Sequence, residues 1–188
     1  MCGFIVTNLN IDLKRNMKLL NHRGPDDIGI INNNEIKIIF NRLSILDVNR
    51  RSNQPMRYKN YIIIFNGEIY NYLELKKYLE KQGMFFSTKS DTEVLIKLFY
   101  LKGIDSLKLL EGMYSFCVYN TINKELIIAR DPFGIKPLFY KIYENNFFVS
   151  SEKNVFIKNN LQGKLNYFAL ANYLHNGVYQ DSRKTFFS

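Results

Sequence analysis

"MCGFIVTN" (residues 1–8) places one of the two cysteines directly behind the initiator methionine, at the start of an apolar segment. The segment predicts a buried strand over residues 2–8. A cysteine in this position is a poor core residue, because chain termini fray and seldom anchor packing. The position is chemically useful if Met1 is removed, since Cys2 then carries a thiol and a free α-amine on one residue.

A thiol and an amine on one residue make a nucleophile with its own base. The thiolate is the reactive form of cysteine, and a pKa of about 8.5 leaves the thiol mostly protonated at neutral pH. An α-amine, with a pKa of about 7.7–8.0, can accept that proton. The alternative is a small buried residue that opens a strand, and residues 1–8 alone favour it. The second thiol, Cys117, lies in the apolar stretch "YSFCVYN" (114–120) and is expected to be buried and inert.

A second polar cluster, "FNGEIYN" (65–71), lies between a predicted strand and a predicted helix. A tetrahedral oxyanion needs N–H donors aimed at it. The Asn66 side-chain amide and the Gly67 backbone N–H are two candidates, and Glu68 could face a cationic group. The alternative is an ordinary strand-to-helix turn, in which Asn-Gly is common.

Two other side chains could bind the charged ends of an amino acid. The stretch "NRLSILD" (41–47) sets Arg42 among apolar residues, where its guanidinium could hold a carboxylate through two parallel hydrogen bonds. Asp91, at the start of a predicted helix, could hold an ammonium group. The alternatives are a surface ion pair for Arg42 and a favourable helix-dipole contact for Asp91.

The stretches "HRGPDD" (22–27) and "ARDPFGIKPLFY" (129–140) are predicted as turns. The second is interpreted as structural or as a surface that faces a partner. The two histidines, His22 and His175, lie far apart and show no metal-ligand spacing, so no metal site is expected. The chain has neither of the common glycine-rich phosphate-binding motifs.

The composition is that of a globular protein. Its 188 residues can bury one sizeable core, and 46% of them are hydrophobic. Apolar runs such as "YIIIF" (61–65) are too short to span a membrane. Two cysteines do not make a disulfide framework, which predicts a reduced, cytoplasmic compartment. The formal charge of +9 is scattered along the chain, so nucleic-acid binding is a minor alternative.

Strands and helices are predicted in alternating groups. Leu13, Met17 and Leu20 have helical spacing, and Ser90 with Glu93 has the pattern of a capping box. The grouping predicts layered α and β structure with a largely antiparallel sheet. Strands are expected over 2–8, 28–32, 35–41, 61–67, 114–120, 125–130, 137–140 and 147–151, and helices over 11–24, 72–83, 90–103 and 166–177.

Taken in order, eight stretches resemble the glutamine-hydrolysing domain of class II amidotransferases, and within that class the asparagine synthetase branch. They are "MCGF", "HRGPDD", "NRLSILD", "FNGEIYNY", "SDTEV", "LEGMYSFCVYN", "ARDPFGIKPLFY" and "SSEK". The stretches "HRGPDD" and "RLSILD" favour that branch over the purine-biosynthesis and glucosamine-phosphate branches. The resemblance implies an α+β fold, a four-layer αββα N-terminal-nucleophile sandwich with two mainly antiparallel sheets.

The resemblance also implies a mechanism that needs no cofactor or metal. After removal of Met1, Cys2 attacks the carboxamide of glutamine, Asn66 and Gly67 stabilise the oxyanion, and water hydrolyses the γ-glutamyl thioester. The implied glutamine pocket consists of Arg42 for the α-carboxylate, Glu68 and Asp91 for the α-ammonium, Asn66 and Gly67, and the backbone of Leu43, Ser44, Ile45 and Leu46.

The expected organisation is an amidotransferase domain over 1–160, with 161–188 beginning the connection to a synthetase domain beyond this sequence. By resemblance, that domain would use ATP and magnesium to activate aspartate and would receive the ammonia. L-glutamine and the synthetase domain are thus the expected partners, without nucleic acid or membrane, and a homodimer is left open. Two alternatives remain: the same domain serving a sugar or peptide-like acceptor, and a degenerate binding module without activity.

Overall fold

A computed structural model of the chain describes residues 1–178 and 185–187. The chain forms two compact units, Met1–Lys153 and Asn154–Ser188. The first unit contains every residue predicted to form the site. Part of the predicted connection over 161–188, at 179–184 and 188, lies outside the described residues.

The strands of the first unit follow the predicted pattern. They are β1 (Gly3–Thr7), β2 (Asp27–Asn32), β3 (Lys37–Arg42), β4 (Met56–Tyr58), β5 (Tyr61–Ile69), β6 (Gly112–Asn120), β7 (Leu126–Arg130), β8 (Phe139–Tyr143) and β9 (Asn146–Ser150). They form two antiparallel sheets with the strand orders β2-β3-β1-β9-β8 and β4-β5-β6-β7. A strand is present at each of the eight predicted positions, although β8 shares only residues 139 and 140 with the strand predicted over 137–140. The strand β4 was not predicted, because three residues, "MRY", carry no usable periodicity.

The helices of the first unit are α1 (Leu13–Leu20), α2 (Tyr72–Lys81) and α3 (Asp91–Lys102), with 3-10 turns at Arg50–Ser52 and Gly103–Leu109. The helix predicted over 11–24 is shorter, ending at Leu20, before the turn that leads to Gly24. Ser90 caps α3 by accepting the N–H of Glu93 at 3.3 Å. The Glu93 carboxylate instead accepts hydrogen bonds from Ser87 and Thr88, so only half of the predicted capping box forms.

The strand β5 shows why the sequence "YIIIF" is apolar at every position. Successive strand side chains point to opposite faces of a sheet. Ile62 and Ile64 pack in the cluster between the two sheets, together with Phe4 and Phe40 of the other sheet. Ile63 and Phe65 point the other way, into a cluster that includes residues of α2 and α3. A strand buried on both faces needs an unbroken apolar run.

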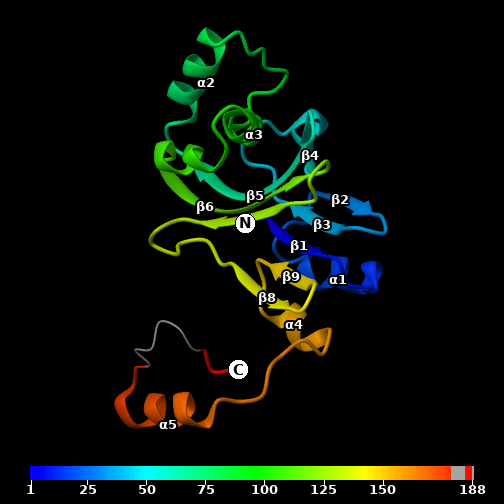
Figure 1. The fold of residues 1–188 in the computed structure, drawn as a ribbon, viewed down its shortest axis with the longest axis vertical. Coiled ribbons are helices and arrows are strands. Elements are labelled where there is room, and N and C mark those ends of the chain that lie inside the picture. The colour runs from blue at the N-terminus through cyan, green and yellow to red at the C-terminus, as the bar shows by residue number, and fades with distance from the viewer. Residues whose placement is uncertain (179–184, 188) are drawn as a thin grey trace. The chain divides into compact units, whose positions relative to one another are not determined.

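The first unit therefore has four layers. The helices α2 and α3 cover the sheet that contains β5 and β6 (Figure 1). In the other sheet, Phe4 and Val6 face the inter-sheet cluster, so Gly3 and Ile5 face outward. The helix α1 lies against that outer face, where a Cβ on Gly3 would be 3.3 Å from the Leu20 side chain. The predicted α+β sandwich with two antiparallel sheets is confirmed.

The strand-to-helix turn considered for residues 65–71 is wrong over its first part. The strand β5 continues through Asn66, Gly67 and Glu68 to Ile69, paired with β6, where Gly67 lies opposite Tyr114. A Cβ on Gly67 would lie 2.2 Å from the Met113 carbonyl oxygen, so only glycine allows this close approach. As a result Asn66 and Glu68 are held on a paired strand rather than on a loop.

The second unit contains α4 (Asn154–Lys158) and α5 (Tyr167–Asn176). The helix α5 confirms the helix predicted over 166–177. Asn166 caps its first turn by accepting the N–H of Ala169 at 3.1 Å, and Gly177 ends it in the left-handed region at φ 71°. Within the described ranges, no helix has the length and apolar character that a bilayer crossing requires.

Gly29 gives a stability prediction. It lies on β2, and an added Cβ would be 1.8 Å from the Gln54 carbonyl oxygen. Gln54 in turn bonds both backbone groups of Phe65 on β5. We expect Gly29→Ala to lower the free energy of unfolding by about 2–4 kcal/mol, because backbone has to move. Urea denaturation of both chains measures this loss. A loss below about 0.5 kcal/mol would mean that the Gln54 segment shifts freely.

Candidate active site

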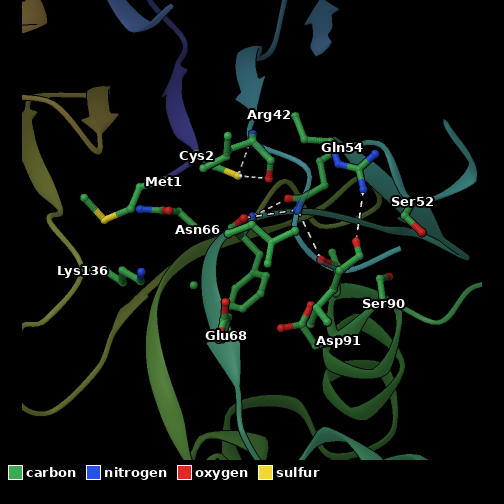
Figure 2. A pocket seen from close by; sticks show the side chains of 16 residues that line it. Met1, Cys2, Arg42, Ser52, Gln54, Asn66, Glu68, Ser90, Asp91 and Lys136 are labelled. Carbon is green, nitrogen blue, oxygen red and sulfur yellow. Dashed lines mark hydrogen bonds between the residues drawn. The ribbon is translucent and has the colours of Figure 1, made fainter. Parts of the chain in front are cut away.

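The predicted site residues converge on one pocket of the first unit. It forms where the start of β1, the end of β3, the middle of β5 and the start of α3 meet (Figure 2). Its lining consists of Met1, Cys2, Arg42, Leu43, Ile45, Leu46, Ser52, Gln54, Phe65, Asn66, Gly67, Glu68, Ser90, Asp91, Thr92 and Lys136. Segments far apart in the chain thus supply a thiol, amide and backbone donors, two carboxylates and two cations.

Cys2 lies at the entrance to β1 with its thiol held by the next strand. Its Sγ accepts a hydrogen bond from the Leu43 N–H at 3.4 Å and donates to the Leu43 carbonyl at 3.6 Å. Arg23 fixes the backbone, because its Nε donates to the Cys2 carbonyl at 3.1 Å. Burial raises the pKa of the Cys2 thiol, while the Leu43 N–H, the chain's terminal amine, Arg42 and Lys136 act in the opposite direction. The thiol therefore needs a nearby base to react at neutral pH.

Asn66 supplies an uncommitted donor to the same pocket. Its side chain is 1% exposed, and its Nδ2 group is buried without a hydrogen-bond partner. Buried amide donors are nearly always paired, since an unpaired one costs about 1–3 kcal/mol. Asn66 lies on β5 between Phe65 and Gly67, which are both paired with β6, so its side chain cannot turn to solvent. The geometry provides a fixed N–H donor that has no partner among the residues described by the structure.

Arg42 is buried and heavily bonded. Its Nη1 donates to the Asn49 carbonyl at 3.2 Å and to Asn53 Oδ1 at 2.5 Å. Its Nη2 donates to the carbonyls of Leu46 and Asp47 at 3.3 and 2.6 Å. The four terminal N–H groups of the guanidinium thus hold the 46–53 segment in place. The surface ion pair considered for Arg42 is not what the structure shows.

Two carboxylates occupy the end of the pocket formed by β5 and α3. Asp91 is 5% exposed, and its Oδ2 accepts the Ile69 N–H at 3.1 Å. Burial raises the pKa of Asp91 to about 6, and the neighbouring Glu68 charge acts in the same direction. A cation between Glu68 and Asp91 would relieve this repulsion, which makes this end of the pocket suited to an ammonium group.

The predicted backbone wall is present except at one residue. Leu43, Ile45 and Leu46 line the pocket. Ser44 does not, and its N–H donates to Asp26 Oδ2 at 2.7 Å. Asp26 belongs to the "HRGPDD" stretch, which thereby supports the pocket wall from outside. Within the described ranges, no group of histidine, cysteine and acidic residues is arranged to hold a metal ion.

Several lining residues were missed from the sequence. Gln54 is 8% exposed and joins β5 to α3, because its Nε2 donates to the Phe65 carbonyl and to Thr92 Oγ1, each at 3.2 Å. Lys136 belongs to the stretch interpreted as a structural turn. A single glutamine and a lysine within a turn carry no local signal, because their roles arise only from tertiary contacts.

Several known proteins are similar to this chain in sequence. The profile of the family described as "Glutamine amidotransferase domain" matches residues 1–188. Asparagine synthetase (glutamine-hydrolyzing) 1 of Bacillus subtilis (strain 168) is 41% identical over 173 residues, covering 85% of this chain and 27% of the relative. A putative asparagine synthetase (glutamine-hydrolyzing) 2 of Methanocaldococcus jannaschii is 37% identical over 161 residues, covering 75% of this chain and 31% of the relative. The chain thus spans about a third or less of the length of these relatives.

A solved structure shares the fold. The glutamine phosphoribosylpyrophosphate amidotransferase of B. subtilis, complexed with ADP and GMP, superimposes with a TM-score of 0.69 at 25% identity. The similarity covers 84% of this chain and 43% of that one. With a family profile matched over residues 1–188 and a four-layer fold shared with an amidotransferase, the chain belongs to the family of glutamine amidotransferase domains.

Proposed function

We propose that this domain hydrolyses L-glutamine through a γ-glutamyl thioester on Cys2 and supplies the ammonia to a synthetase region that forms asparagine from aspartate. The observation that carries the glutaminase part is the buried, unpartnered Nδ2 of Asn66 in a pocket that also holds the Cys2 thiol. A donor kept without a partner is what a developing oxyanion requires.

The proposed reaction begins when removal of Met1 leaves the Cys2 α-amine free. The thiol proton moves to that amine, and the sulfur attacks the carboxamide carbon of glutamine. The C–S bond forms while the carbonyl electrons move to oxygen, where Asn66 and the Gly67 N–H stabilise the charge. The C–N bond then breaks as the amine returns its proton to the leaving nitrogen, which releases ammonia. Water hydrolyses the thioester to glutamate and regenerates the thiol.

The charged ends of glutamine match the two sides of the pocket. The α-ammonium is placed between Glu68 and Asp91, and the α-carboxylate at Arg42. Because the 46–53 segment occupies four N–H groups of Arg42, a bound carboxylate has to take over some of them. Glutamine binding and rearrangement of this segment are therefore linked in the proposal. Glutamate is expected to be rejected, since its side-chain carboxylate would bring a negative charge to the developing oxyanion position.

Two preparations test the glutaminase proposal. One retains Met1, and the other is released from a fusion by a protease so that Cys2 is the first residue. Both are incubated with a diazo-ketone analogue of glutamine and measured by intact mass. A single adduct that maps to Cys2 in the second preparation, and is absent or much slower in the first, supports the proposal. No adduct in the second, although a simple alkylating agent labels Cys2 there, would favour a binding module without activity.

The acceptor is proposed from the relatives, which carry the name asparagine synthetase. In this proposal ATP and magnesium bind in the synthetase region. The whole protein is cytoplasmic and acts on neither nucleic acid nor membranes. The test is to incubate the longer protein containing this domain with glutamine, aspartate, ATP and magnesium, and to quantify asparagine. Glutamate without asparagine would favour the alternative, a sugar or peptide-like acceptor.

The raised pKa of Asp91, about 6, predicts a pH-dependent KM for glutamine. Below pH 6 the carboxyl is increasingly neutral and loses its attraction for the α-ammonium. We expect KM to rise as pH falls through 6, by up to about tenfold per pH unit well below it. Steady-state kinetics between pH 5 and 8 measures this change. Asp91→Asn should raise KM at every pH and flatten the profile.

A stability measurement checks the same residue independently. The folded-state pKa of Asp91, about 6, lies above the ordinary value of 3.8. The free energy of unfolding therefore falls as the pH rises from about 4 to about 6, and stays at the lower value above pH 6. Asp91→Asn is therefore expected to raise the thermal midpoint at pH 7 without raising it at pH 4. An equal change at both pH values would assign the effect to packing instead.

A further inference from the structure

Lys136 places a positive charge in the pocket, and most of its side chain is enclosed by the fold. It lines the pocket with Met1 and Cys2 and is 7% exposed. Among the residues that the structure describes, its ammonium has no hydrogen bond or ion pair, whereas its backbone N–H and carbonyl are both bonded. The ammonium itself is not sealed off from solvent, so its charge faces the open space of the pocket.

The turn before β8 fixes this lysine in place. The Asp131 carboxylate accepts the N–H groups of Ile135 and Lys136 at 2.8 and 3.0 Å, and that of Tyr114 on β6 at 3.3 Å. From the other side, Arg130 donates to the carbonyls of Gly134 and Lys136, each at 2.6 Å. The Asp131 carboxylate thus accepts three backbone N–H groups, and among the described residues it forms no ion pair with the Lys136 ammonium.

The position of Lys136 sets it apart from the other charged groups. Figure 2 shows Lys136 on the side of Cys2 where Met1 lies, with its ammonium directed toward the pocket, whereas Asp91 lies on the opposite side. Arg42 is the other cation in the lining, and the 46–53 segment occupies its terminal N–H groups.

The remaining charges near residue 2 are paired or lie at the ammonium end. Arg23 bonds the Cys2 carbonyl and forms an ion pair with Glu152 at 3.4 Å. Asp26 holds the Ser44 N–H. Glu68 lines the pocket on β5. Within the described residues around Cys2, Arg42 and Lys136 are the two side-chain cations of the lining, and neither forms an ion pair with a carboxylate. Lys136 differs because its terminal nitrogen also has no hydrogen bond.

We propose that Lys136 is a positioning residue that acts through residue 2, where its positive charge, paired with no carboxylate among the described residues, makes the thiol and α-amine of Cys2 release their first proton more readily. This inference rests on the proposed use of Cys2 as a nucleophile.

The direction of the effect follows from charge alone. When Met1 is absent, residue 2 holds two protonated groups, an ammonium and a thiol. Loss of one proton lowers the charge of the residue by one unit, whichever of the two groups keeps the other proton. A fixed cation nearby favours that loss. Lys136 thereby increases the fraction of residue 2 that has lost a proton at neutral pH, which is the fraction ready to attack. The positive charge of Lys136 lowers the pKa of the Cys2 thiol, in agreement with this direction.

The test uses the chain with Cys2 as first residue, unaltered and as Lys136→Met and Lys136→Arg. Iodoacetamide alkylation of Cys2, followed by mass spectrometry from pH 5.5 to 9.5, reports the deprotonated fraction without any need for glutamine. We expect Lys136→Met to move the midpoint of the profile upward by about half to one pH unit. Alkylation at pH 7 then falls about three- to tenfold, and the rates converge at high pH. Lys136→Arg should keep the original midpoint.

Coincident profiles for all three chains would overturn the role of Lys136, and so would an equal shift in the arginine variant. An unchanged thermal midpoint would show that Lys136→Met is folded. The pH profile separates the two roles, because a merely structural role would change the alkylation rate at every pH without moving the midpoint of the profile. Labelling by the diazo-ketone analogue, measured in parallel, tests the underlying function separately. A shifted profile without such labelling would keep the role of Lys136 and reject the glutaminase.

Discussion

Replacing Cys2 with alanine is expected to abolish glutamine hydrolysis, with a loss in kcat by a factor of about 10⁴ or more. No other side chain can replace the sulfur, because the second cysteine, Cys117, is 2% exposed and packed between the two sheets. Among the described residues, the Cys2 side chain hydrogen-bonds only the Leu43 backbone and packs at the margin of the cluster between the sheets, so alanine, which keeps the Cβ, should leave the pocket walls in place. Release of glutamate, measured by a coupled assay, gives the loss.

The matched control is Cys117→Ala. It removes the other thiol of the chain and is expected to leave kcat within about twofold while lowering stability by about 1 kcal/mol, as a small core truncation does. Glutamine should still stabilise Cys2→Ala in a thermal-shift measurement, because its charged ends are bound elsewhere. Measurable turnover by Cys2→Ala would reject Cys2 as the nucleophile, and loss of activity in both variants would indicate damage to the fold.

Asn66→Ala is expected to lower kcat by a factor of about 10² to 10³, the usual effect of removing one oxyanion donor. The KM for glutamine should change little, because the donor acts on charge that develops only in the transition state. The variant should fold normally, since the Asn66 Nδ2 group bonds nothing in the resting protein. Steady-state kinetics with thermal denaturation separates these effects.

Ser115 offers a matched control for Asn66. It lies directly opposite Asn66 on β6, and its hydroxyl is also buried without a hydrogen-bond partner, but it does not line the pocket. Ser115→Ala is expected to keep kcat within about twofold. If the two variants lose activity equally, the effect arises from the β5–β6 pairing. If Asn66→Ala raises KM with kcat unchanged, Asn66 binds the ground state instead.

The sequence predicted helices and strands correctly where the local pattern of apolar residues reflects which side chains are buried. The strand β5 is an unbroken apolar run because it is buried on two faces, and α3 begins at a recognisable cap. The short strand β4 has too few residues for any pattern. The extension of β5 beyond Gly67 depends on the approach of the Met113 carbonyl, a contact made by a residue far along the chain.

The sequence predicted most of the residues of the proposed site, but it missed Gln54 and Lys136 and did not indicate the hydrogen bonds. Sequence motifs brought Cys2, Arg42 and Asn66 together correctly. They could not indicate that the 46–53 segment would occupy the Arg42 guanidinium, because hydrogen-bond partners are set by loop geometry. Lys136 was missed for a related reason, since a lysine in a surface-like turn is usually solvated, and only the Asp131 network turns it inward.

The 46–53 segment, which accepts hydrogen bonds from the Arg42 guanidinium, competes intramolecularly with any carboxylate that would bind there. An intramolecular ligand has a fixed effective concentration, which dilution or buffer exchange cannot reduce. Any free carboxylate in solution must outcompete it, so a simple anion that gains only the guanidinium contact is at a disadvantage. In the proposed binding mode, an amino acid whose α-ammonium also lies at Glu68 and Asp91 can meet that cost. The affinity of the proposed pocket for glutamine should therefore change on substitution of Asn53, whose side chain accepts from Arg42 and does not line the pocket.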